Sequence, residues 1–238
     1  ETDYTRIYDQ SKVISYYDDV AATFTNFAMS GIDKVHFGLE AAVSIPIYHT
    51  LALNGAVSWG QYTYDSNPYY LQTQDNSGDI VSDGYVYWKD FRVESTPQTA
   101  VNVGLSWRSN NNIYLSADFN YYNNMYLSMS PIYRTDAVIT GGMAPGDIEH
   151  LRRQEKFDSA YTLNASIGKN WYIHRKYTLG FSLDVKNILN NQDIKTGGYE
   201  QTRLSKNTET TVTTYQAFDS KYFYMFGTTY YLNLYFRF

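Results

Sequence analysis

The side chains that could carry out chemistry are few and widely spaced. Four histidines are present, His36, His49, His150 and His174, and no two of them have the spacing expected of zinc ligands. The chain has no cysteine, which excludes a disulfide scaffold, a thiolate zinc site and a cysteine nucleophile. No serine lies in the Gly-x-Ser-x-Gly context of a nucleophile elbow. The sequence therefore predicts neither an enzyme nor a bound cofactor or metal.

Three carboxylates lie close together at Asp75, Asp79 and Asp83, and oxygen ligands of this kind could hold calcium. They lack the ordered ligand spacing of a known calcium loop, so a solvated acidic turn is the favoured interpretation. The formal net charge of −5 leaves no basic stripe that could neutralise phosphates, which argues against nucleic acid as a partner.

A cluster of aromatic side chains is the best candidate for ligand contact. Flat rings in a long loop could stack on sugar rings or on peptides. For any single ring, packing within the loop or anchoring of an outer rim is the favoured alternative. The cluster comprises Tyr69, Tyr70, Tyr85, Tyr87 and Trp88.

The elements that must position these groups are β-strands. Between Tyr177 and Lys186, apolar and polar residues alternate, and this period of two is typical of a strand with one apolar face. The same alternation recurs in about seven segments, each near the length that a tilted membrane strand needs. The other six lie at Val35–Ile45, Leu51–Trp59, Thr99–Trp107, Ile113–Tyr121, Tyr161–Gly168 and Tyr222–Phe238.

The connections between these strands alternate between short and long. Short ones fall near residues 48–50, 109–112 and 174–176, and long ones span about 65–97, 128–158 and 190–221. A soluble antiparallel sandwich also alternates in sequence. However, short turns at one end and long loops at the other are typical of outer-membrane barrels. We therefore predict an all-β fold, an antiparallel transmembrane β-barrel wall.

Aromatic residues support a membrane boundary. They make up 18% of the chain, and 26 of them are tyrosines, whose rings suit an interface that is apolar on one side and wet on the other. One lysine, Lys169, falls on the apolar side, two residues before Trp171, where its stem can reach the headgroups. The expected girdles are Trp107, Trp171 and Tyr177 at the periplasmic rim, and Trp59, Tyr121 and Tyr161 at the outer rim.

Residues 1–33 lack clean alternation. We expect them to form an extracellular loop that leads into the first strand near Lys34, so that residues 34–238 constitute the barrel segment.

Two stretches resemble known receptors. The aromatic end Tyr230–Phe238 resembles the C-terminal assembly signal of outer-membrane proteins, in which Phe236 and Phe238 would be recognised by the barrel-insertion machinery. Asn187-Ile188-Leu189-Asn190 resembles an element in the penultimate strand of TonB-dependent receptors. Other phrases, among them residues 29–36, 96–100, 195–201 and 221–224, resemble receptors of the Bacteroidota type.

This resemblance implies a plugged barrel of about 22 strands in the bacterial outer membrane, to which the chain would contribute the C-terminal part. Such receptors import scarce nutrients with energy passed on by TonB. The implied partners are the plug and N-terminal strands of the same receptor, the TonB complex, the insertion machinery and membrane lipid, with a surface lipoprotein as a further option. The substrate stays open among siderophore, haem, cobalamin, glycan and peptide.

Six ionisable residues share the polar side of the predicted strands. They would either contact the plug, so that it can be displaced, or take part in a hydrated network in the lumen, and the sequence favours neither. The six are His36, Glu40, Asp118, Asp184, Lys186 and Arg237.

An alternative of another class is a complete small barrel of eight strands with a structural or enzymatic role. It requires one more strand from residues 1–30. On the fragment hypothesis, the strand near Val35–Ile45 and the strand Tyr222–Phe238 are both edges that pair outside the chain.

Overall fold

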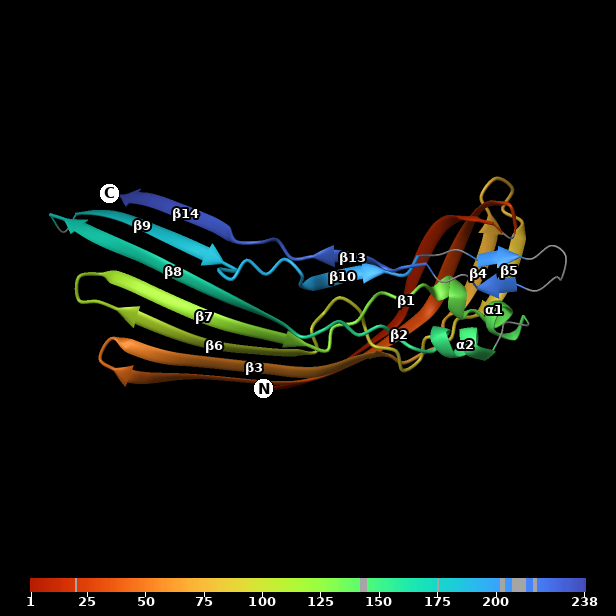
Figure 1. Cartoon of the computed structure of the whole chain (residues 1–238), viewed down its shortest axis with the longest axis horizontal. Helices are drawn as coiled ribbons and strands as arrows, with labels where there is room; N and C mark the ends of the chain where they lie inside the picture. Colours follow the sequence, from red (N-terminus) through yellow and green to blue (C-terminus); the bar gives the residue numbers. More distant parts are fainter. Residues whose placement is uncertain (20, 142–144, 175, 202–203, 207–212, 216–217) are drawn as a thin grey trace.

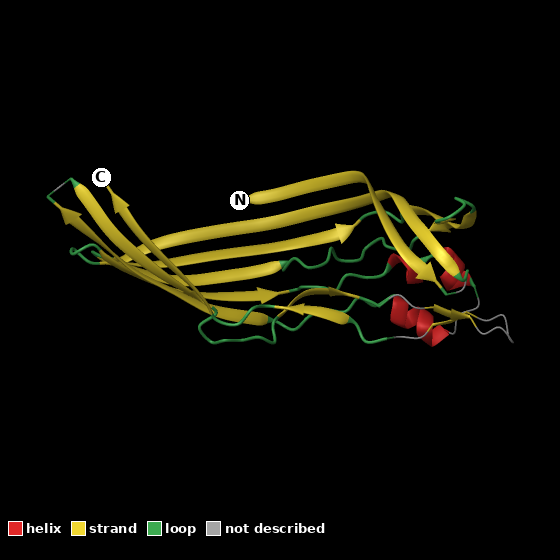
Figure 2. Cartoon of the chain, turned by 90° about the horizontal axis from the view of Figure 1, so that it is seen from above, coloured by secondary structure: helices red, strands yellow, loops and turns green. Residues whose placement is uncertain are grey.

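The computed structural model describes residues 1–238 except 20, 142–144, 175, 202–203, 207–212 and 216–217. The chain is all-β, built mostly of antiparallel sheet, with short helices near one end (Figure 2). Among the described residues, no helix has both the length and the apolar character needed to cross a membrane.

One sheet of ten strands dominates the structure, in the order β14-β9-β8-β7-β6-β3-β2-β4-β5, with β1 also paired to β2. Its long part confirms the predicted strands. We call this part the long sheet; its strands lie side by side (Figure 1) and form a curved surface (Figure 2). It comprises β2 (Thr23–Tyr48) from Lys34 onward, β3 (Leu51–Tyr64), β6 (Thr99–Arg108), β7 (Ile113–Asn123), β8 (Ala160–Ile173), β9 (Tyr177–Lys186) and β14 (Thr229–Arg237).

The predicted alternation of connections is confirmed. Residues 49–50, 109–112 and 174–176 connect neighbouring strands at one end of the long sheet, which we call the turn end. The C-terminus lies at the same end (Figure 1). The three long connections all leave the opposite end, where they form further elements rather than irregular loops.

The three long connections fold together into a unit that we call the headpiece. It also includes the parts of β1 and β2 that extend beyond the long sheet (Figure 1). A buried cluster that includes Phe27, Met29, Tyr64, Val86 and Ile132 forms its main core. Its other elements are β4 (Tyr69–Gln74), β5 (Ile80–Tyr85), the 3₁₀ helix η1 (Pro131–Arg134), α1 (Asp136–Thr140), α2 (Pro145–Leu151), β10 (Lys195–Tyr199), β11 (Leu204–Lys206), β12 (Thr213–Tyr215) and β13 (Lys221–Tyr224).

The prediction of a loop over residues 1–33 is wrong. Strand β1 (Thr2–Asp18) runs antiparallel to β2, which already begins at Thr23. The register shifts twice near Gln10, with the extra residue on β1 between Ile7 and Gln10 and on β2 between Met29 and Ile32. The bulge in β1 exchanges the face on which its later side chains lie. Most β1 side chains are also exposed, so no buried side imposes an apolar pattern. These two features explain why the sequence showed no alternation there.

The last predicted strand is divided in two. Strand β13 pairs with β10 in the headpiece, whereas β14 pairs with β9 in the long sheet. Between them, the Met225 N–H donates to the Ile194 carbonyl, and the Thr228 N–H donates to Asn190 Oδ1. These hydrogen bonds take the place of strand pairing between Tyr224 and Thr229. The predicted strand is therefore interrupted there, although its apolar pattern continues through Phe226.

The sheet is open. The strand near Val35–Ile45 was predicted to be an edge of the sheet. The segment Val35–Leu39 is not an edge, because it pairs with Thr2–Arg6 of β1. Strand β14 lies at the other end of the strand order. Within the described residues, β1 and β14 do not pair with each other, and the sheet does not close into a barrel.

Candidate functional site

The polar face of the long sheet carries all six of the ionisable residues selected from the sequence. Residues directly opposite in neighbouring strands share a face. The register places Glu40 opposite Ser58, and Asp118 opposite both Gly104 and Asn164. By the same rule, His36, Asp184, Lys186 and Arg237 lie on this face, opposite Tyr62, Ser166, Thr229 and Thr178 respectively.

Neutral hydrogen bonds connect the strands across this face. Asn102 Nδ2 donates to Asn120 Oδ1 over 2.8 Å, and Asn120 Nδ2 donates to Thr162 Oγ1 over 3.4 Å. Ser116 and Ser166 share a hydrogen bond of 2.8 Å. In the described chain, none of the six ionisable residues forms a salt bridge with another of the six. The charges on this face are therefore not neutralised by other members of the six.

Small side chains create a shallow hollow in the polar face. Ala42, Ala56 and Ala100 lie on neighbouring strands, and Glu40 and Asn102 contribute to the same hollow of about 580 Å³. A surface of this shape can accept side chains that project from a facing segment.

The opposite face of the long sheet is apolar and largely exposed. The register aligns Leu53 with Leu105, and Leu183 with both Ile167 and Leu232, so the apolar residues form continuous rows across the strands. A contiguous exposed surface of this kind marks an interaction site, because soluble monomers rarely leave such patches in water. Exposed members include Leu39, Val43, Val57, Val103, Leu105, Leu115, Ile167, Leu179, Leu232 and Leu234.

The predicted girdle residues lie at the two ends of this apolar face. At the turn end, Trp171 pairs with Leu179, and the Tyr177 ring stacks on Phe236 at 5.7 Å. Lys169 lies on the apolar face, opposite Phe181, with its ammonium 5.2 Å from the Trp171 ring. Its position beside the turn end agrees with the predicted one.

The five loop aromatics do not act together. Tyr70 and Trp88 are 1% and 2% exposed, respectively, and belong to the headpiece core. The Tyr70 ring stacks on Phe27 at 4.7 Å, and Trp88 stacks on Tyr64 at 4.5 Å. These two rings therefore stabilise the headpiece, in agreement with the packing alternative.

The other three loop aromatics are accessible. Tyr69 and Tyr85 meet edge to face at 5.7 Å, and Tyr87 is exposed as well. The Tyr69 hydroxyl donates to Asp83 Oδ2 over 2.6 Å, and this bond raises the pKa of the phenol. Of the five loop aromatics, these three can contact a ligand at the surface of the headpiece.

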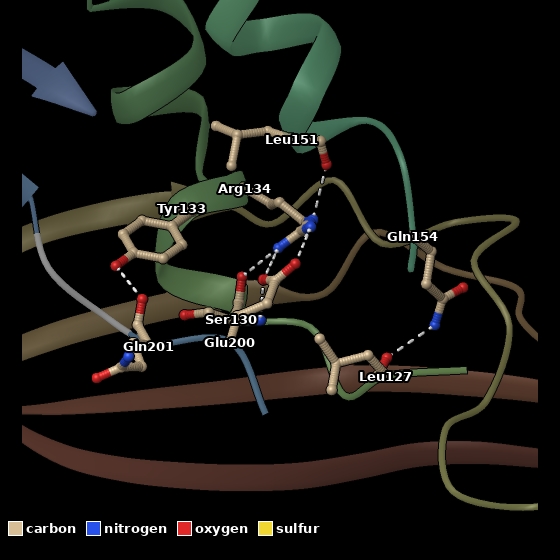
Figure 3. Close-up of polar contacts among 8 residues, drawn as sticks. All are labelled: Leu127, Ser130, Tyr133, Arg134, Leu151, Gln154, Glu200 and Gln201. Atoms are coloured by element: carbon tan, nitrogen blue, oxygen red, sulfur yellow. Dashed lines mark hydrogen bonds and ion pairs between the residues drawn. The ribbon is translucent and has the colours of Figure 1, made fainter. Parts of the chain in front are cut away.

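A buried ion pair in the headpiece was not found from the sequence. Arg134, only 1% exposed, donates from both terminal nitrogens to the Glu200 carboxylate, at 2.6 and 2.9 Å (Figure 3). It also donates to the carbonyls of Leu151 and Ser130. The pair joins the second long connection to the third, and no sequence signal marks residues 66 positions apart as partners.

The hydrogen bonds of Gln154 also join the long connections. Gln154 Nε2 donates to the carbonyls of Leu127 and Arg92, and Arg92 belongs to the first long connection. The Arg92 N–H donates in turn to Gln154 Oε1. All three long connections are therefore joined by buried or half-buried hydrogen bonds.

The Asn187–Asn190 element forms a turn at the headpiece end of β9. Asn187 has a φ of 52°, a left-handed conformation that asparagine tolerates better than most residues. Its side-chain nitrogen donates to the carbonyls of Asn191 and Phe226, and its carbonyl accepts from Thr228 Oγ1. The element thus fixes the path of the chain into β14.

The C-terminal aromatics lie on the apolar face or beyond its end. Phe236 pairs with Leu179, and Phe238 is 93% exposed. One edge of β14 is paired with β9 along Thr229–Arg237, and in the described part of the chain the other edge has no strand beside it. An aromatic end on an open edge strand is accessible to another protein.

Individual hydrogen bonds account for the acidic turn. Asp75 accepts from Asn26, and Asp79 accepts from Ser77. Within the described residues, no group of three or more His, Cys, Asp or Glu side chains could hold a metal ion.

No known protein family and no curated protein matches the chain.

Proposed function

We propose that this chain forms part of the wall of a β-barrel in the bacterial outer membrane, and that the barrel is a TonB-dependent receptor for a scarce nutrient. The long sheet carries this proposal, because it separates an exposed apolar face from a polar face over its whole length. In a bilayer, the apolar face contacts lipid and the polar face lines an aqueous lumen.

The two ends of the long sheet suit opposite sides of a membrane. The short turns match the periplasmic side of known barrels, and the long connections match the outer side. On this orientation, the headpiece projects outward, and its buried ion pair presents Tyr69, Tyr85 and Tyr87 on a rigid support. A receptor needs such a binding surface.

The open edges support a larger assembly. In lipid, each unpaired backbone group costs several kcal/mol, so an open sheet cannot persist there. We infer that further strands of the same receptor pair with β14 and with the free edge of β1. A plug in the lumen would then face His36, Glu40 and the other four ionisable residues of the polar face.

The alternative of a complete small barrel gains support from β1. This strand provides the eighth long strand that the alternative required. Closure would need β1 to pair with β14, and within the described residues these two strands do not pair. The larger assembly is therefore the better account.

The transport role can be tested by growth. Two strains are compared on a panel of limiting nutrients: one lacks the gene for this protein, and the other lacks TonB. The proposal predicts at least one nutrient on which both strains fail and on which the parent grows. If the first strain shows no defect that the second shares, import through TonB is refuted. Restoration of growth by the intact gene controls for secondary mutations.

A further inference from the structure

The headpiece contains a small pocket where the first long connection meets the second, with a volume of about 220 Å³. Two of its aromatic side chains come from the first connection, and the others come from η1, α1 and the C-terminal end of α2. Pockets for drug-sized ligands are usually larger, so this one suits a single ring. The lining residues are Tyr87, Phe91, Arg134, Ile139, Leu151 and Arg152.

The inner wall of the pocket is held in place by contacts of its own. Leu151 is 2% exposed, and Phe91 packs against the main core of the headpiece. The Arg134 guanidinium lies 5.5 Å from the centre of the Phe91 ring, and its Nε donates to the Leu151 carbonyl (Figure 3). The wall is therefore formed before a ligand arrives, which lowers the entropic cost of binding.

The two guanidinium groups that line the pocket differ in their contacts. Arg134 is buried, and its charge is matched by the Glu200 carboxylate. Arg152 is exposed, and no side chain in the described part of the chain forms a hydrogen bond or an ion pair with it. The next residue, Arg153, is paired with Glu149 instead. Among the described residues that line the pocket there is no Asp or Glu, so the Arg152 charge is not offset within it.

Tyr87 gives the pocket an accessible aromatic side. Its side chain is 43% exposed, and its backbone N–H donates to the Arg134 carbonyl over 2.8 Å, which ties the residue to η1. Ile139 is half-buried and provides a branched apolar surface in the same pocket. An aromatic ligand can therefore contact both aromatic and aliphatic side chains, and aromatic pairs gain more than the buried area alone provides.

We propose that this pocket binds a small aromatic carboxylate. The Arg152 guanidinium donates two hydrogen bonds to the carboxylate, because its planar fork matches the two oxygens. The ring of the ligand packs among Tyr87, Ile139 and Leu151. A neutral ligand of the same shape forgoes the charged contact, and a carboxylate without a ring forgoes the apolar one. The proposal does not depend on transport or on TonB.

Calorimetry with three related probes tests both parts of the ligand. Phenylacetate and phenylacetamide have nearly the same shape, but only phenylacetate is charged, whereas acetate keeps the charge and lacks the ring. Purified protein in detergent should bind phenylacetate at least about tenfold more tightly than either of the others. Titrations into detergent alone are subtracted, since a phenyl ring partitions into micelles. Equal affinity for phenylacetate and either comparison probe, or no binding of phenylacetate, would overturn the proposal.

A pair of arginine variants locates the charged contact. Arg152→Gln removes the charge at an exposed position and should lower the affinity for phenylacetate about tenfold, while binding of phenylacetamide stays the same. Arg153→Gln is the matched control, because Arg153 is the adjacent exposed arginine and does not line the pocket. Unchanged affinity in Arg152→Gln, or an equal loss in Arg153→Gln, would refute the role of Arg152.

A pair of tyrosine variants locates the ring contact. Tyr87→Ser should weaken the binding of phenylacetate several-fold, because it removes an aromatic side of the pocket. Tyr85→Ser should leave the affinity unchanged, since Tyr85 is also exposed but is absent from the lining of this pocket. Equal affinities in the two variants would place the ligand elsewhere on the headpiece and overturn the assignment.

Discussion

The long sheet and the headpiece are stabilised in different ways. The long sheet sorts its side chains by face and buries few of them, so its stability rests on the backbone ladder and on what surrounds it. The headpiece has its own core and a buried ion pair that joins distant segments. The comparison teaches that one chain can combine a sheet with an exposed apolar face and a unit that carries its own core.

A change at the C-terminus should give the largest difference in effect between the long sheet and the headpiece. Deletion of Phe238 should lower the amount of folded protein in outer membranes several-fold, because the proposed assembly signal is lost. The protein that does assemble should keep a normal headpiece, since Phe238 is exposed and distant from it. Heat-modifiable migration on gels measures the folded amount. An unchanged amount would show that Phe238 has no role in assembly.

The buried ion pair should affect the headpiece alone. Arg134→Met leaves the Glu200 carboxylate without its partner, and loss of one member of a buried pair costs about 3 kcal/mol. Limited proteolysis should then cut within the headpiece, while the long sheet stays resistant. Arg153→Met is the matched control, because its pair with Glu149 is exposed and should contribute nothing measurable. Equal protease resistance in all three proteins would contradict the role given to Arg134.

Close packing on the polar face should affect the long sheet alone. A Cβ added at Gly168 would overlap the Tyr114 ring and lie 2.7 Å from the Phe181 carbonyl oxygen. Gly168→Ala should therefore destabilise the sheet by about 1–3 kcal/mol, measured by unfolding in denaturant. Gly55→Ala is the control, since its nearest neighbour, Val43 Cγ1, lies at an ordinary 3.4 Å. If the two variants are equally stable, the close contacts of Gly168 with Tyr114 and Phe181 do not limit the size of the side chain at this position.

Alkaline pH should weaken the headpiece by a smaller amount. Burial first, and then Glu94, raises the pKa of Tyr64 above its ordinary value, because both disfavour the phenolate. The folded state therefore keeps the proton that the unfolded chain releases near pH 10. This contribution is complete below about pH 10 and is lost as the pH rises toward the folded pKa. Protease resistance should fall less steeply above pH 10 in Tyr64→Phe, and identical slopes would contradict this assignment.

The long sheet was predictable from sequence because a strand with one apolar face and one polar face has a strict period of two. Leu179, Phe181 and Leu183 alternate with Gly180, Ser182 and Asp184 for that reason, and the register confirms the shared faces. The six ions were placed on one face by the same rule.

The headpiece was not predictable, because its contacts depend on long-range packing. Nothing local pairs Arg134 with Glu200, or indicates that Trp88 is buried and Tyr87 exposed. Strand β1 was missed because a bulge between Ile7 and Gln10 interrupts its alternation and most of its side chains are exposed. The break before β14 was missed because the partners of Met225 and Thr228 lie more than 30 residues away.

The central proposal is that the long sheet has lipid on one face and water on the other. Single cysteines at adjacent positions test it: Phe181→Cys on the apolar face and Ser182→Cys on the polar face. In outer membranes, a lipid-soluble maleimide should label Phe181→Cys, and a small membrane-impermeant maleimide should label Ser182→Cys. Reversed labelling, or equal labelling of both positions by the aqueous reagent, would contradict the account.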